Sequence, residues 1–263
     1  MDFVAPLIES DLAVHTRSDL PYVVLTFAQS LDGCIGSKDN RQPLLLSGTE
    51  SMRLTHAIRQ SCDAILVGSG TVANDNPRLN VRSELLFSSK QSPNSETEAI
   101  NSDSTNNIVI KHPRPVVLDA RLITPPNANI VLLKNNPILI ASYSDSDLVM
   151  TYKRKTLEEL GVSVVNVPDT RNLLSILSIL KRDFGISSIM VEGGARVISS
   201  FLNSDLVDRI IITIAPLFVG DGVKAIAENT DDKTNASGNV TRRLVDPVYK
   251  QFGRDIVVAA KMN

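Results

Sequence analysis

The segment Ile189-Met190-Val191-Glu192-Gly193-Gly194-Ala195-Arg196-Val197-Ile198 joins a short apolar run to two glycines and then to the start of a helical pattern. A second segment of the same kind is Ala64-Ile65-Leu66-Val67-Gly68-Ser69-Gly70-Thr71. Glycines at the end of a strand let a ligand approach the backbone closely, and the unpaired N–H groups of a helix N-terminus attract anions. Two such strand-to-helix turns predict a site for a phosphorylated ligand.

Short apolar runs alternate with helical patterns on both sides of these turns. We expect strands at residues 22–28, 64–68, 115–119, 138–141, 162–167, 186–191, 209–215 and 249–260. Helices are expected up to about residue 60, at 170–184 and at 195–203, and residues 29–36 are expected to form a turn. Ser47 and Glu50 have the spacing of a capping box for the first of these helices. The alternation predicts an α/β fold with helices on both faces of a central sheet.

Composition restricts the class of protein. The chain of 263 residues is long enough for a full core, and its net charge of −2 offers no basic field for nucleic acid. Two cysteines cannot form a disulfide framework, and neither a signal-peptide core nor a membrane-length apolar run is visible, so we expect a cytoplasmic protein. We expect one domain over residues 1–263, in which residues 83–114, rich in Ser, Asn, Glu and Pro, form an exposed insertion.

The glycine turns carry the candidate ligand contacts. Glu192 stands at the carboxyl end of a strand, where ligands bind in parallel sheets. In the other turn, Thr71 and Asp75 share one face if the segment is helical. Backbone donors for a pyrophosphate are expected at Gly194, Ala195 and Arg196. A structural interpretation stays open, in which the glycine pair is a tight turn, Thr71 caps a helix and Asp75 is a solvated acid.

Other side chains narrow the chemistry. Three arginines flank the first glycine turn, and a bidentate guanidinium suits phosphate; they are Arg59, Arg78 and Arg82. The three histidines show neither a Ser or Cys partner pattern nor zinc-ligand spacing, so we expect no metal site; they are His15, His56 and His112. Asp32, beside Gly33, is either a catalytic carboxylate or a turn residue, and the turn role is the commoner one.

Several motifs in a fixed order carry a family resemblance. They are Ala28-Gln29-Ser30-Leu31-Asp32-Gly33, the segment Gly68 to Arg82, Val117-Leu118-Asp119, Val191-Glu192-Gly193-Gly194 and Ile214-Ala215-Pro216-Leu217. In this combination the chain resembles the RibD C-terminal-like reductases of riboflavin biosynthesis, from about Pro21 to Ala260. The resemblance implies a dihydrofolate-reductase-like fold with a mostly parallel sheet. Because the zinc deaminase signature H-x-E with P-C-x-x-C is absent, the chain is similar to the stand-alone, fungal type.

The resemblance also implies a cofactor, an assembly and a set of contacts. The cofactor is NADPH, and the assembly is a homodimer. The implied cofactor contacts are Thr71, Asp75, Val167, Gly193, Gly194, Ala195, Arg196 and Val197, with Ala120 as a further lining position. On the substrate side, the implied contacts to a ribose phosphate are Arg59, Leu79 and Arg82, while Glu192 faces the substrate.

The reaction implied by the resemblance reduces 2,5-diamino-6-ribosylamino-4(3H)-pyrimidinone 5′-phosphate. Hydride reaches C1 of the ribose and leaves a ribitylamine. Glu192 is the candidate for orienting the substrate amine or relaying a proton. The bacterial fused relatives carry a lysine near the position of Thr26. Because this chain has threonine there, a proton-donor role is not carried over to that position.

Three other functions stay open at this point. A dihydrofolate-type reductase acting on a pterin would need no phosphate clamp. A protein that only senses NADPH would bind the cofactor without oxidising it. A deaminase is disfavoured by the missing zinc ligands.

Overall fold

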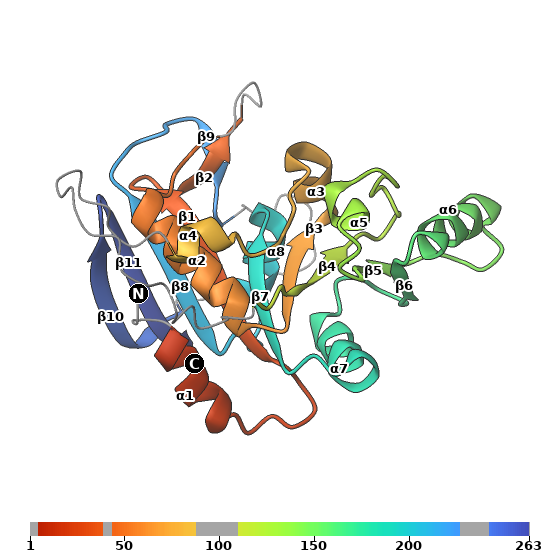
Figure 1. Ribbon diagram of the computed structural model, residues 1–263, viewed down its shortest axis with the longest axis horizontal. Helices are drawn as coiled ribbons and strands as arrows, with labels where there is room; N and C mark the ends of the chain where they lie inside the picture. Colours follow the sequence, from red (N-terminus) through yellow and green to blue (C-terminus); the bar gives the residue numbers. More distant parts are fainter. Residues whose placement is uncertain (1–4, 39–43, 88–109, 227–241, 263) are drawn as a thin grey trace, which may run out of the picture.

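The chain forms one large sheet and a small ribbon. The computed structural model describes residues 5–38, 44–87, 110–226 and 242–262. Within them, nine strands make a sheet in the order β10-β11-β8-β1-β7-β3-β4-β5-β6, and β2 pairs with β9 (Figure 1). All neighbours from β8 to β6 are parallel, while β11 runs antiparallel to β8 and to β10. The predicted mostly parallel sheet is confirmed.

The elements follow the chain in this order. The strands are β1 (Tyr22–Ser30), β2 (Cys34–Ser37), β3 (Ala64–Gly68), β4 (Arg114–Leu118), β5 (Ile138–Ala141), β6 (Ser163–Asn166), β7 (Ser188–Gly193), β8 (Arg209–Ala215), β9 (Gly222–Lys224), β10 (Leu244–Phe252) and β11 (Asp255–Met262). The helices are α1 (Ala5–Ala13), α2 (Thr49–Ser61), α3 (Ser69–Asp75), α4 (Ser83–Phe87), α5 (Asn129–Leu132), α6 (Leu148–Glu159), α7 (Leu173–Phe184) and α8 (Ala195–Leu202).

Helices cover both faces of the sheet, as predicted. Alternate residues of β1 point to opposite faces: Val23 and Leu25 pack under α7 and α8, while Tyr22 and Val24 pack under α1 and α2. On the α1–α2 face, α3, α5 and α6 continue the cover over β3, β4 and β5. Because the central strands are buried on both sides, they are continuous aliphatic runs such as Ala64 to Val67.

Two local predictions are wrong because glycines turn the chain within the expected elements. Residues 249–260 are not one strand but the two sides of a hairpin, β10 and β11, which turns at Gly253 with a φ of 59°. Residues 29–36 are not all turn. β1 continues to Ser30, Gly33 takes a φ of 78°, and β2 begins at Cys34.

The predicted capping box at Ser47 and Glu50 is also wrong. The N-cap of α2 is Gly48, and no side chain of its own segment caps it. Instead, the carboxylate of Asp255, at the start of β11, accepts hydrogen bonds from the Gly48 N–H at 2.7 Å and from the Ser51 hydroxyl. Asp255 is fully buried, so it requires such donors, and the long-range cap replaces the local one.

The expected insertion at residues 83–114 is only partly visible. Its first residues form the short helix α4, which packs beside α2, and Arg114 already belongs to β4 (Figure 1). Residues 88–109 lie outside the described residues. The elements that were not predicted include the helices α1, α4, α5 and α6 and the strands β2 and β9.

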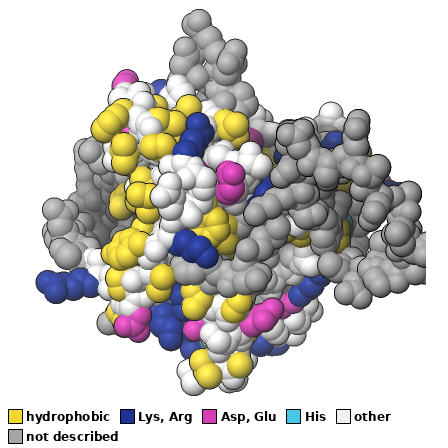
Figure 2. Space-filling model, turned by 60° about the vertical axis from the view of Figure 1, so that its left-hand side comes forward, with side chains coloured by type: hydrophobic (Ala, Val, Ile, Leu, Met, Phe, Trp, Pro, Cys, Tyr) yellow, Lys and Arg dark blue, Asp and Glu magenta, His cyan; other side chains and the backbone are white. Residues whose placement is uncertain are grey.

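None of the helices described is both long enough and apolar enough to cross a bilayer. Figure 2 brings forward the side of the molecule that lies at the left of Figure 1, where hydrophobic and charged side chains are mixed. In the β10–β11 hairpin, Val248, Tyr249 and Ile256 are exposed.

A buried charge network fixes α1 on the sheet. The Asp11 carboxylate accepts hydrogen bonds from the Tyr22 hydroxyl at 2.5 Å and from Arg209 Nε at 2.6 Å. Lys261 Nζ lies 3.6 Å from the other carboxylate oxygen. Burial raises the pKa of Asp11, but the hydrogen bonds from Tyr22 and Arg209 and the nearby positive charges outweigh it and hold the pKa below 3.8.

We predict that Asp11→Asn lowers the free energy of unfolding by about 3 kcal/mol, because Arg209 then stays buried without a counter-charge. Tyr22→Phe removes only one hydrogen bond and should cost about 1 kcal/mol. Because the folded-state pKa is lowered, the Asp11 contribution is fully present above about pH 4 and is lost as pH falls through the folded-state pKa. Urea unfolding of both variants at pH 7 measures the two losses of unfolding free energy, and equal losses would contradict a role for the charge.

Candidate active site

The expected site lies at the carboxyl-terminal edge of the sheet, across the ends of its central strands. The parallel strands β1, β7 and β3 end side by side there, with β7 in the middle. Leu66 of β3 pairs with Val191 of β7, but the next residue, Val67, pairs with Gly193. Glu192 is therefore an extra residue in β7 opposite β3. Bulges of this kind re-aim a side chain, and this one accompanies a Glu192 carboxylate that reaches α2.

An ion pair joins α2 to the end of β7. Arg59 Nε donates to Glu192 Oε1 at 2.6 Å, and Arg59 Nη2 donates to Glu192 Oε2 at 2.7 Å. The two side chains are only 14% and 18% exposed. Burial lowers the pKa of Arg59, but the Glu192 carboxylate more than offsets this and raises it, so the guanidinium stays charged. Two parallel bonds fix both the position and the plane of the carboxylate.

Two imidazoles and Arg59 hold the backbone that follows α3. Arg59 Nη1 donates to Asn80 O at 3.0 Å. The Val81 N–H donates to His112 Nδ1 at 3.2 Å, and the Arg82 N–H donates to His56 Nδ1 at 3.1 Å. Neither histidine was expected at the site. The signal available in the sequence was the spacing of His56 and Arg59, which places both on one face of α2.

The glycine turns bring α3 and α8 into contact. Gly193 and Gly194 have φ angles of 106° and 72°, which favour glycine. A β-carbon on Gly193 would lie 2.7 Å from Ile198 Cγ1, and one on Gly194 would lie 3.0 Å from Thr71 Oγ1. The Thr71 hydroxyl donates to Gly193 O at 3.3 Å. Side chains at these glycines would therefore fill the space between the two turns.

The N-terminus of α8 has no side-chain cap. Gly194 is its N-cap, and the bond from Ile198 N to Gly194 O, at 3.0 Å, starts the helix. The N–H groups of Ala195, Arg196 and Val197 come before that first bond. N–H groups at a helix N-terminus can attract an anion, and these lie beside Thr71. Val197 also packs its side chain against Gly68, where a β-carbon would lie 3.0 Å from Val197 Cγ2.

The remaining residues expected in the first turn have different surroundings. The segment is helical, which was the condition for Thr71 and Asp75 to share one face, and the two lie one turn apart on α3. The N-cap of that helix is Gly68 rather than Thr71. Asp75 is exposed at the helix end, and partial enclosure of its carboxyl raises its pKa. Leu79 is buried in the core with a φ of 51°, whereas the Arg82 side chain is exposed.

Val167 lies at the same edge of the sheet, just after β6, which is the third strand beyond β3. It lines a pocket together with Ser142, Tyr143, Ser144, Asn166 and Pro168. The Val167 N–H donates to Ala141 O at 2.8 Å, and the Ser142 N–H donates to Ala120 O at 3.1 Å. Ala120 and Val167 thus flank the carboxyl end of β5, apart from the glycine turns.

Asp32 has a structural role. Its carboxylate accepts hydrogen bonds from the Val219 and Gly220 N–H groups at 3.1 and 2.8 Å and from the Ser30 hydroxyl at 2.5 Å. The bond from Ser30, followed by those from Gly220 and Val219, holds the pKa of Asp32 well below its usual range. Asp32 therefore joins the turn after β1 to the loop before β9, as the turn interpretation predicts.

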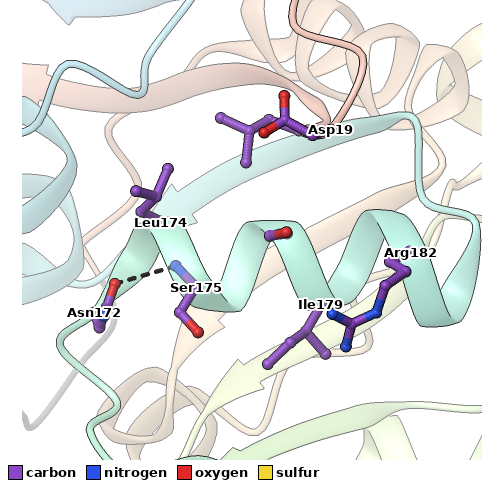
Figure 3. Close-up of a pocket in the computed structure, with 8 residues that line it drawn as sticks. Asp19, Asn172, Leu174, Ser175, Ile179 and Arg182 are labelled. Carbon is purple, nitrogen blue, oxygen red and sulfur yellow. Dashed lines mark hydrogen bonds between the residues drawn. The ribbon is translucent and has the colours of Figure 1, made fainter.

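Another pocket lies on the outer side of α7 (Figure 3). Asn172 caps this helix by accepting the Ser175 N–H at 3.1 Å. The helix packs on the face of the sheet opposite to α2 and Glu192. The lining contains none of the expected site residues; it is formed by Asp19, Leu20, Asn172, Leu174, Ser175, Ser178, Ile179 and Arg182.

Known proteins are similar to this chain in sequence and in architecture. The 2,5-diamino-6-ribosylamino-4(3H)-pyrimidinone 5′-phosphate reductase of Debaryomyces hansenii is 35% identical over 257 residues, covering 94% of this chain and 91% of that protein. The structure of the Saccharomyces cerevisiae riboflavin biosynthesis reductase Rib7 matches with a TM-score of 0.67 and 27% identity, covering 98% of this chain and 99% of that one. Acinetobacter baumannii RibD matches with a TM-score of 0.69 and 23% identity over 93% of this chain, which spans 58% of that longer protein.

The family comparison covers almost all of the described fold. The RibD C-terminal domain matches residues 21–258, a range that begins just before β1 and ends within β11. It includes both glycine turns, the Arg59–Glu192 ion pair and the pocket at Val167, and it leaves out α1. The chain belongs to the RibD C-terminal domain family.

Proposed function

We propose that this protein is an NADPH-dependent reductase of 2,5-diamino-6-ribosylamino-4(3H)-pyrimidinone 5′-phosphate in riboflavin biosynthesis. The observation that carries the proposal is the placement of the Arg59–Glu192 pair directly beside the glycine turn of α8. A charged pair that can contact a polar substrate is thereby joined to an end of a helix that binds anions. The curated names of the relatives, among them those of Debaryomyces hansenii and Saccharomyces cerevisiae, support the same reaction.

The residues present fit a dinucleotide. Gly193 and Gly194 leave open the space that β-carbons would fill, and the uncapped N–H groups of Ala195 to Val197 suit a pyrophosphate. Thr71 Oγ1 lies close to the same turn. The polar pocket at Val167, farther along the same edge, suits the adenosine end. When bound, the reduced nicotinamide supplies the hydride for C1 of the ribose.

Glu192 is the residue that we assign to the substrate. Arg59 holds its carboxylate ionised and oriented, so it can accept a hydrogen bond from a substrate amine. The register of β1 and β7 pairs Leu25 with Val191, which makes Thr26 the next residue along β1 beside Glu192. Arg82, whose side chain is exposed, and the uncommitted N–H groups of Arg59 are assigned to the 5′-phosphate. A homodimer, which the family resemblance implies, and a cytoplasmic location, which the composition predicts, complete the proposal.

The proposal is tested by mixing the purified protein with NADPH and the ribosylamino pyrimidine phosphate and following the loss of absorbance of the reduced nicotinamide. Substrate-dependent oxidation is expected. Oxidation with dihydrofolate instead would favour the pterin reductase. Binding of NADPH without oxidation by either substrate would favour the sensor, and absence of NADPH binding would overturn the assignment.

We predict that Glu192→Gln lowers kcat/KM at least tenfold, because the amide keeps the shape but loses the charge and one acceptor oxygen. The affinity for NADPH should stay within about threefold of the wild-type value, because the proposed cofactor contacts are the backbone of the glycine turn and α8 and not the Glu192 side chain. The control is Glu158→Gln, which removes a charge from an exposed pair with Arg154 on α6 and should leave kcat/KM unchanged. Wild-type kcat and KM in the Glu192 variant would contradict its assigned role.

We predict that Gly194→Ala weakens NADPH binding more than tenfold, because the β-carbon would approach Thr71 Oγ1 and strain the turn that precedes α8. Gly185→Ala is a control for a positive φ away from the site. It forces alanine to a φ of 66° in the left-handed helical region, and a β-carbon there has no neighbour within 4 Å. Gly185→Ala should lose about 1 kcal/mol of stability. Gly194→Ala should lose more, because its φ of 72° and ψ of 148° belong to a region that is essentially restricted to glycine. Fluorescence titration with NADPH separates them, and equal affinities in the two variants would count against a cofactor site at Gly194.

A further inference from the structure

His56 and His112 support a backbone segment rather than reacting groups. The segment follows α3, and its three consecutive residues Asn80, Val81 and Arg82 each have a backbone atom bonded to a side chain from elsewhere. Two of the three bonds use imidazole nitrogens as acceptors of backbone N–H groups. Such N–H groups, in a segment outside regular structure, have no strand or helix partner of their own.

The acceptor role fixes the chemical state of His56. A nitrogen that accepts a hydrogen bond carries no proton, so the proton of the neutral ring lies on Nε2. The ring is 1% exposed. Burial, followed by the charges of Arg59 on α2 and of Arg82, lowers the pKa of His56 to about 4, against the opposing effect of Glu192 on β7 and Glu84 on α4. The ring is therefore neutral at physiological pH.

His56 also connects the two arginines that we assign to the substrate. It lies three residues before Arg59 on α2, and it bonds the backbone of Arg82. Arg59 in turn bonds Glu192 and the carbonyl of Asn80. A leucine could fill the volume of the ring but could not accept the N–H of Arg82. The nitrogen thus sets where the exposed Arg82 side chain begins.

We propose that His56 is a positioning residue that fixes Arg82 for the phosphate of the substrate, with His112 as a second support at Val81. This inference rests on the proposed function, because it takes the phosphate from the proposed substrate. His56 does not donate a proton in the reaction; it acts through the backbone of Arg82. A change at His56 should consequently affect substrate binding more than hydride transfer or cofactor binding.

The test compares His56→Leu with His56→Asn in the full-length protein. The asparagine Oδ1 can replace Nδ1 as acceptor, whereas leucine removes the acceptor and keeps an apolar side chain of similar size. We expect His56→Leu to raise KM for the pyrimidine phosphate at least tenfold, with kcat within about twofold and NADPH affinity unchanged. His56→Asn should restore KM to within about threefold of wild type. His112→Leu, at an exposed position, should raise KM by a smaller factor.

Each outcome decides one point. An inactive wild-type protein would mean that the proposed function has failed, independently of His56. With active wild-type protein, an unchanged KM in His56→Leu would overturn the inference. A lower kcat, weaker NADPH binding and a raised KM together, without rescue by asparagine, would also overturn it, because a merely structural role gives that pattern. If His56→Leu does not fold, the other two variants decide. A near-normal KM in His56→Asn with a raised KM in His112→Leu would support the proposal. A tenfold rise of KM in His56→Asn with an unchanged KM in His112→Leu would count against it.

Discussion

The arrangement of the site depends on close packing at the glycines that end β7. Gly193 leaves no room for a β-carbon beside Ile198, and Gly194 leaves little beside Thr71. Because the two turns meet there, the start of α8, the hydroxyl of Thr71 and the extra residue Glu192 lie within one short stretch of the sheet edge. Side chains at these glycines would separate α3 from α8 and move the N-terminus of α8 away from Glu192.

Charge is distributed unevenly across this edge. The whole chain has a net charge of −2, so any affinity for a phosphate has to come from local groups. The positive charge of Arg59 is largely compensated by Glu192, and His56 is neutral. The exposed Arg82 and the N-terminus of α8 are positive groups that the Arg59–Glu192 pair does not neutralise. We therefore propose that Arg59 mainly orients Glu192 and that Arg82 is the phosphate ligand.

The sequence predicts the parts of the structure that depend on neighbouring residues. The aliphatic strands, the two glycine turns and the common face of Thr71 and Asp75, once their segment is helical, follow from local patterns. The Arg59–Glu192 pair joins residues 133 positions apart, and the cap of α2 comes from Asp255 in β11. Such contacts depend on the order of strands in the sheet, which periodicity does not specify. The β10–β11 hairpin was missed because its only local signal is Gly253 within an otherwise strand-like segment.

The central claim is that Arg59 and Glu192 act as one unit on the substrate. A double-mutant cycle of Arg59→Met, Glu192→Gln and the combined variant, read as kcat/KM for the pyrimidine phosphate, tests it most directly. If the pair is one unit, the two losses should be clearly less than additive, with a coupling above about 1.4 kcal/mol, a factor of ten in rate. Effects of the two substitutions that simply add would contradict the claim, because each side chain would then act on its own.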